Sequence, residues 1–136
     1  MPSKAAIVGL LLDQPFEIGE SHPAEKALRD AISALGSGAF HWMKSIMREN
    51  ANSPSTTSSM LRCFGRLDRK ISGEWGPELI RVALFDPDIE IREAAVRAVE
   101  DWSDRNLAPD LQRALAQEKL PWMADYIRQV LASFNE

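Results

Sequence analysis

Apolar residues recur three and four positions apart in segment after segment of this 136-residue chain, the spacing that gathers them on one face of an α-helix. No stretch alternates apolar and polar residues with the β-branched enrichment typical of strands. The pattern predicts an all-α protein of eight helices in four antiparallel pairs. We expect them near Ser3–Leu12, Ala24–Leu35, Ala39–Asn50, Pro54–Lys70, Pro77–Phe85, Ile89–Trp102, Leu107–Gln117 and Pro121–Phe134.

Residues suited to helix ends stand at these boundaries. Proline opens several of the segments, where its missing N–H would have been unpaired in any case. Ser53 is suited to cap the fourth helix and Gly36 to end the second, and Gly73 and Gly76 are expected to break the chain before the fifth. The fourth helix has the weakest pattern, because its start is rich in Ser and Thr and Gly65 costs about 1 kcal/mol relative to alanine inside a helix.

The apolar stripes of these helices predict the core. The expected core residues are Leu28, Ala31, Ile32, Leu35, Phe40, Met43 and Met47, then Ile91, Ala95, Ala98, Val99 and Trp102, and finally Met123, Ile127, Val130, Leu131 and Phe134. Small Ala94 is expected to allow close approach of a neighbouring helix. Substituting Val99 by Asp would bury an unpaired charge and should unfold the domain.

The C-terminal half contains an internal repeat. Pro77 matches Pro109, Arg81 matches Arg113, Val99 matches Leu131 and Trp102 matches Phe134, always with an offset of 32 positions. A shared offset at both ends of the unit indicates a duplicated helix hairpin. A weaker match, between Leu28-Arg29 and Ile91-Arg92, extends the repeat toward the N-terminus.

These residues resemble the HEAT-repeat pattern of an outer helix, a short turn with aspartate and an inner helix that opens with an aliphatic–Arg step. The unit over 77–102 fits best, with the turn Asp86-Pro87-Asp88 followed by Ile91-Arg92. The resemblance implies one domain over residues 1–136, a short α-solenoid of about four helix pairs. It also implies that inner helices line the binding side. Arg92, next to the turn, is expected to bridge to a neighbouring turn.

The last unit departs from that pattern. Ala124 stands where the preceding unit has Arg92, and Leu120-Pro121 replaces the aspartate of the turn. Terminal repeats commonly deviate because one of their faces meets water. The segment Pro121–Phe134 is therefore expected to close the stack as a cap.

Charge and cysteine content narrow the function classes. The net charge is −4, with nine Lys/Arg against eight Asp/Glu in residues 1–76 and seven against twelve in residues 77–136, whereas nucleic-acid binders usually carry a basic face. The single cysteine, Cys63, cannot form an intramolecular disulfide. The apolar run Ala5–Leu12 is too short to span a bilayer and lacks a cleavage site after it. We expect a cytoplasmic protein without a membrane association.

The inner helix over 89–102 provides the main candidate binding surface. Its residues outside the core stripe are Glu90, Glu93, Arg97 and Glu100, a mainly acidic set that suits a protein partner with a basic surface. On the last helix, Trp122, Tyr126 and Gln129 share a stripe outside the core. Two interpretations stay open for that stripe, an aromatic interface and a cap folded over the end of the core.

A second candidate surface is basic. Arg62, Arg66, Arg69 and Lys70 recur at helical spacing in the fourth predicted helix and could bind phosphate or an acidic partner. The alternative is that these cations favour a helix C-terminus and face water. The open ends of the stack are further candidate surfaces, for self-association.

Nothing in the sequence marks a catalytic, metal or cofactor site. Asp86 and Asp88 could share a cation, but no third acid is placed to complete the site and helix capping explains them better. His22 and His41 lie in different segments and are expected to be partly exposed, and Cys63 has no acid–base partner.

The first hypothesis is therefore a protein-binding adaptor or regulatory module with no enzymatic activity, and an inhibitor or immunity-type partner is one form that such a module takes. Alternatives are a nucleic-acid binder that resembles the HEAT-like DNA glycosylases and uses the basic stripe, or a protein similar to the HEAT-repeat bilin lyases.

Overall fold

The computed structural model describes residues 2–13, 17 and 21–135, and that part of the chain is all-α, without a strand. Its α-helices are α1 (Lys4–Asp13), α2 (Pro23–Leu35), α3 (Ala39–Glu49), α4 (Pro54–Arg66), α5 (Trp75–Ala83), α6 (Ile89–Trp102), α7 (Ala108–Gln117) and α8 (Pro121–Ser133). Three short 3-10 helices join them, η1 (Gly36–Gly38), η2 (Arg69–Ser72) and η3 (Arg105–Leu107). The all-α class and the eight predicted helices are confirmed.

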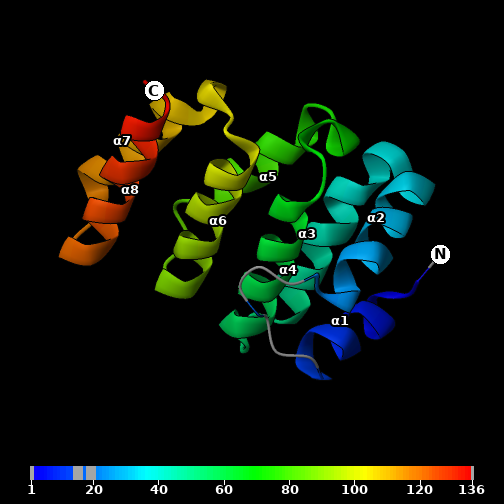
Figure 1. Cartoon of the computed structure of the whole chain (residues 1–136). Coiled ribbons are helices and arrows are strands. Elements are labelled where there is room, and N and C mark those ends of the chain that lie inside the picture. Colours follow the sequence, from blue (N-terminus) through cyan, green and yellow to red (C-terminus); the bar gives the residue numbers. More distant parts are fainter. Residues whose placement is uncertain (1, 14–16, 18–20, 136) are drawn as a thin grey trace.

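The helices form a row that follows the chain. Helices α2, α4, α6 and α8 contact one another in succession, α5 packs on α6, α7 packs on α8, and α3 contacts α5. The chain runs from α1 beside the N-terminus to α7 and α8 at the opposite end of the molecule (Figure 1). Helix α6 therefore lies between α4 and α8, and any surface shared by these three helices is centred on it.

The tightest contact in the row lies between α4 and α6. A Cβ atom added to Gly65 would stand 2.7 Å from Cα and 2.8 Å from Cβ of Ala98, closer than non-bonded carbon atoms approach. Ala94, Ala95 and Ala98 on the facing side of α6 are all buried. The glycine inside α4 thus serves helix packing, and Ala94 is buried as the predicted close approach requires.

Aromatic rings extend this contact toward α5. The ring of Phe64 stacks on Trp75 at 5.5 Å between centroids and meets Trp102 edge-on at 5.3 Å. Both geometries are favourable for aromatic pairs. Most residues of the predicted stripes are buried as expected, but five are only half-buried at the margin of the core: Leu35, Phe40, Met47, Trp102 and Leu131.

The prediction that the fourth helix continues to Lys70 is wrong, because α4 ends at Arg66. Leu67 takes an extended conformation, and its carbonyl accepts a hydrogen bond of 3.2 Å from the indole N–H of Trp102 instead of a helical N–H. Asp68 then accepts from the backbone N–H of Lys70 and opens η2. The helix thus ends through a contact with Trp102, which lies 35 positions away in the sequence. Local helix propensity contains no information on such a partner.

The fifth helix begins earlier than predicted, at Trp75 rather than Pro77, and Gly76 lies inside its first turn instead of breaking the chain. A Cβ at Gly76 would collide with the side chain of Ser72. Gly76 is therefore required by close packing against η2. Gly36 and Gly73 have φ values of 58° and 56° and end α2 and η2, as expected for glycine at a helix end.

His22 is buried, which contradicts the expected partial exposure. The imidazole Nδ1 of His22 accepts a hydrogen bond from the backbone N–H of Ala24. The backbone N–H of His22 donates to Glu25 Oε2 at 2.7 Å. The pair forms a reciprocal cap at the start of α2. Ser53 begins α4 without a capping hydrogen bond to the backbone, and its hydroxyl bonds Thr56 Oγ1 instead.

Helix α1 packs against α2 and α4 through Ile7 and Leu11, so the apolar N-terminal run is a packed helix as predicted. Among the described residues, no helix has the length and hydropathy needed to cross a membrane.

Candidate functional site

Helix α6 begins where the sequence predicts, because Asp88 caps it. The carboxylate of Asp88 accepts a hydrogen bond of 2.8 Å from the N–H of Glu90. Arg92, in the first turn, reaches Glu118 in the α7–α8 connection with two hydrogen bonds of 3.2 Å. The predicted bridge from Arg92 to a neighbouring turn is confirmed, and it ties α6 to the last helix pair.

Fixing α6 in this way places one stripe of its charged residues beside α8. Arg97 forms an ion pair of 3.5 Å with Glu93, and its guanidinium lies 5.2 Å from the ring centroid of Tyr126. The hydroxyl of Tyr126 donates to Glu100 Oε1 at 2.8 Å. Four of the predicted partner-binding residues are therefore joined in one network across α6 and α8.

This network holds Tyr126 neutral. Burial, followed by the hydrogen bond to Glu100 and the charge of that carboxylate, raises the pKa of Tyr126. A phenolate there would stand against the Glu100 carboxylate, so the hydroxyl keeps its proton and remains a donor.

Helix α4 adds positive charge next to the α6 stripe. Partial burial and the nearby cations Arg97 and Arg66 lower the pKa of Arg62, while Glu93 and Asp101 oppose that shift. Burial and the neighbouring Glu100 raise the pKa of Asp101, against the influence of the same arginines. The expectation of a mainly acidic surface is therefore incomplete, because arginines of α4 lie among the acids of α6.

We call this surface the inner face. It comprises Arg62 and Arg66 of α4, Glu90, Glu93, Arg97, Glu100 and Asp101 of α6, and Trp122, Tyr126 and Gln129 of α8. Asp101 was missed by the sequence analysis, although its position four residues after Arg97 places it beside that side chain on the helix.

The aromatic stripe of α8 divides between two environments. Tyr126 is half-buried against α6, whereas the side chain of Trp122, one turn earlier, is 51% exposed and Gln129 is exposed. An indole left in water beside an ordered charge network is the most conspicuous feature of the inner face.

The predicted basic stripe is not continuous along one helix, because α4 ends at Arg66. Arg66, at the end of α4, pairs with Glu25 at 3.3 Å. Arg69 lies in η2, where it pairs with Asp104 at 2.9 Å and covers the ring of Trp102. Lys70 is exposed. The break at Leu67 separates Arg69 and Lys70 from the helical stripe of Arg62 and Arg66.

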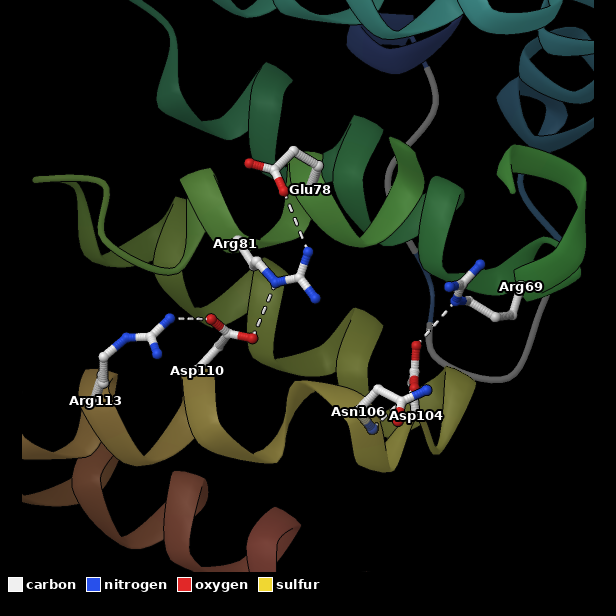
Figure 2. A network of polar contacts seen from close by, with 7 residues as sticks. All are labelled: Arg69, Glu78, Arg81, Asp104, Asn106, Asp110 and Arg113. Atoms are coloured by element: carbon white, nitrogen blue, oxygen red, sulfur yellow. Dashed lines mark hydrogen bonds and ion pairs between the residues drawn. The ribbon is translucent and has the colours of Figure 1, made fainter. Parts of the chain in front are cut away.

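A further polar network lies on α5 and α7 (Figure 2). The buried carboxylate of Asp110 accepts from Arg81 at 3.0 Å and also from Arg113, while Arg81 contacts Glu78 at 3.1 Å. The two arginines are the ones that match in the sequence repeat. Asp110 thus joins equivalent positions of adjacent units, which is a structural role.

The remaining chemical candidates do not assemble a reactive centre. Cys63 is fully buried, and that burial raises the pKa of its thiol to about 12, which leaves little thiolate at neutral pH. Asp86 and Asp88 each accept a backbone N–H in their own turn. The described residues hold no group of three or more His, Cys, Asp or Glu that could bind a metal ion.

Comparison of the chain with protein-family models, with curated proteins and with solved structures returned no match. The geometry of the inner face is therefore the observation that indicates a function.

Proposed function

We propose that this chain is a protein-binding module, an adaptor or regulatory subunit, whose partner docks on the inner face. The observation that supports this most is the exposed Trp122 next to the ordered cluster of Arg97 and Tyr126. Tryptophan, tyrosine and arginine are the residues that most often dominate binding energy at protein interfaces.

The charge network favours binding because it is already ordered. Arg97 is held by Glu93 and by the Tyr126 ring, and Tyr126 is held by Glu100. Immobilising a long side chain at an interface costs about 0.5–1.5 kcal/mol. Side chains that are fixed before binding avoid most of that cost.

The proposed partner is a protein that presents basic side chains around an apolar pocket for the indole. Glu90 is exposed and Glu100 keeps an exposed carboxylate, so both can receive cations of the partner. Arg62 adds positive charge on the α4 side of the inner face, where an acidic residue of the partner would fit.

The resemblance to HEAT repeats agrees with this proposal. Helices α2, α4, α6 and α8 contact in succession, as the inner helices of a short solenoid would, and such helices line the usual binding side. We also propose that the helices form a short solenoid and that the protein has no catalytic role.

The test is capture of partners from the native host on immobilised protein, comparing wild type with Trp122→Ala and with Glu100→Lys. Val82→Ala is the matched control for the first variant, since Val82 is 50% exposed on α5, away from the inner face. Glu74→Lys, at the exposed start of α5, is the control for the second. All variants should keep wild-type circular dichroism.

A protein that is retained by wild type and by both controls, and lost or weakened about 30-fold by Trp122→Ala, is the expected result. Equal retention by all variants would refute the inner face as the docking site. Co-purified nucleic acid in place of a protein would overturn the proposal and direct attention to Arg62 and Lys70.

A further inference from the structure

Two hollows lie along one edge of the helix row, at the connections between paired helices. This turn edge is formed by residues 50–53, 84–88 and 118–120, which join α3 to α4, α5 to α6 and α7 to α8. The first hollow, of about 240 Å³, lies between the second and third connections. The second, of about 310 Å³, lies between the first and second connections.

The first hollow is open to solvent and has both apolar and charged lining residues. Its apolar lining includes Leu84, Phe85, Val96, Leu120, Met123 and Ile127. Phe85 and Leu120 are 39% and 37% exposed, which is high for large apolar residues beside an otherwise packed core. The size suits one or two apolar side chains of a ligand.

The second hollow lies on the other side of the connection between α5 and α6. It is lined by Met47, Ala51, Pro54, Thr57 and Ile91, together with Asp86, Pro87 and Asp88. Asp86 and Pro87 also line the first hollow. The turn Asp86-Pro87-Asp88 is therefore a ridge with a hollow on each side.

The ridge is rigid and negatively charged. Arg92 donates to the carbonyls of Asp86 and Pro87 at 3.0 and 2.8 Å. These two hydrogen bonds hold the turn against the first turn of α6. Asp86 and Asp88 each use Oδ1 for a backbone N–H. Within the described part of the chain, neither carboxylate is paired with a cationic side chain. The charge of Arg92 is already matched by Glu118.

We propose that the turn edge binds an extended peptide segment that places one apolar side chain in each hollow and a lysine or arginine over the Asp86–Asp88 ridge. Adjacent packed helices are about 8–10 Å apart, so the hollows, one on each side of a connection, are about that far apart. An extended segment with three residues per turn and about 3.1 Å per residue puts side chains i and i+3 on one side, about 9 Å apart.

Charge complementarity selects this occupant over an acidic peptide. With three residues per turn, a residue between the two apolar ones points about 120° away from them. A long lysine or arginine side chain there bends back to Asp86 and Asp88, whereas an acidic residue would be repelled by these carboxylates. Lys119 lies on the far rim of the first hollow and is exposed. A second cation beyond that apolar position is therefore disfavoured, which gives the segment a direction.

The turn edge is a different surface from the part of the inner face around Glu100, and this inference does not depend on the proposed function. Glu100 lies twelve residues after Asp88 on α6, about 18 Å along the helix axis at 1.5 Å per residue. Glu90 and Trp122 of the inner face lie two residues from Asp88 and Leu120 of the turn edge, so Glu100→Lys is the inner-face variant that can leave the turn edge intact.

Fluorescence anisotropy with three labelled nine-residue peptides tests the inference. The probe carries a central Leu-Ser-Arg-Leu, the charge control has Leu-Ser-Glu-Leu, and the apolar control has Ser in place of both leucines. We expect saturable binding of the probe, at least tenfold weaker binding of the charge control and no binding of the apolar control. Equal binding of probe and charge control, or no binding of any peptide up to millimolar protein, would overturn the proposal.

Variants locate the site. Leu120→Asp and Ala51→Trp, which alter one exposed position in each hollow, should each weaken probe binding tenfold or more. Val82→Asp and Glu100→Lys should leave binding unchanged, because neither residue lines the hollows. Loss with Glu100→Lys but not with Leu120→Asp would place the peptide on the inner face and refute the turn edge. If the wild-type protein binds the probe and the inner-face variants still retain the host partner, this inference is supported and the proposed function is refuted.

Discussion

At the scale of single residues, several side chains have environments that only their distant neighbours explain. Gly65 is the clearest case. Its cost of about 1 kcal/mol in a helix interior is offset by the approach of α6, since Ala98 occupies the space that a side chain would need. Small residues at such a point let two helices bury their flanking apolar side chains against each other.

Substituting Gly65 by alanine should therefore destabilise the protein, despite the better helix propensity of alanine. The new Cβ would meet the backbone of Ala98, and overpacking of this kind costs about 1–3 kcal/mol. Gly9→Ala in α1 is the matched control, because a Cβ there has open space, and it should stabilise by about 0.5–1 kcal/mol. Urea unfolding of both variants checks the opposite signs. Stabilisation by Gly65→Ala would disprove the close α4–α6 contact.

Tyr126 offers a spectroscopic readout of the inner face, because the chain contains one tyrosine. Its pKa is raised, first by burial and then by the hydrogen bond to Glu100. Alkaline absorbance titration should give a midpoint above the value of about 10 for free tyrosine, and Glu100→Gln should lower that midpoint without returning it fully to 10. A wild-type midpoint near 10 would show that the network is not formed.

The same titration has a consequence for stability. Because the folded pKa of Tyr126 is higher than its unfolded value, the contribution of this group is complete below about pH 10 and is lost as the pH rises from there through the folded pKa. Tyr126→Phe should remove that alkaline dependence while changing stability near pH 7 by about 1 kcal/mol, the usual value of one hydrogen bond.

At the scale of elements, the sequence predicts helix ends correctly where the capping residue is local and incorrectly where it is distant. Asp88 caps α6 from the preceding position, and that boundary is as predicted. The end of α4 depends on Trp102, which takes the carbonyl of Leu67, and the start of α5 depends on the packing of Gly76 on Ser72. Periodicity and local capping rules contain no information on such partners.

Asp110 links the repeated helices α5 and α7. Its carboxylate, 6% exposed, holds Arg81 and Arg113. Asp110→Asn should lower the free energy of unfolding by about 1–2 kcal/mol. Two fully buried charged hydrogen bonds would contribute more, but both arginine side chains are partly exposed to water.

The control for Asp110 is Asp125→Asn. Asp125 pairs with Arg128 at the same i,i+3 spacing, but both side chains are exposed, and such pairs contribute about 0–0.5 kcal/mol. Thermal unfolding of the two variants should therefore differ clearly. Equal effects would mean that burial of Asp110 does not strengthen its ion pairs.

At the scale of the whole molecule, the row of helices explains which predicted site residues meet. Glu93, Arg97, Glu100 and Tyr126 come together because α6 and α8 are neighbours, an arrangement that the repeat already implied. The presence of Arg62 beside them was not predicted, since the relative rotation of α4 and α6 depends on the Gly65 contact. The acids of α6 consequently belong to a mixed surface.

The central claim is that a protein partner docks on the inner face at Trp122. Site-specific photocrosslinking in the native host tests it most directly, with benzoylphenylalanine placed at position 122 in one strain and at position 82, equally exposed on α5, in another. The account predicts a discrete crosslinked protein from position 122 and none from position 82. No crosslink at 122, or the same products from both positions, would contradict it.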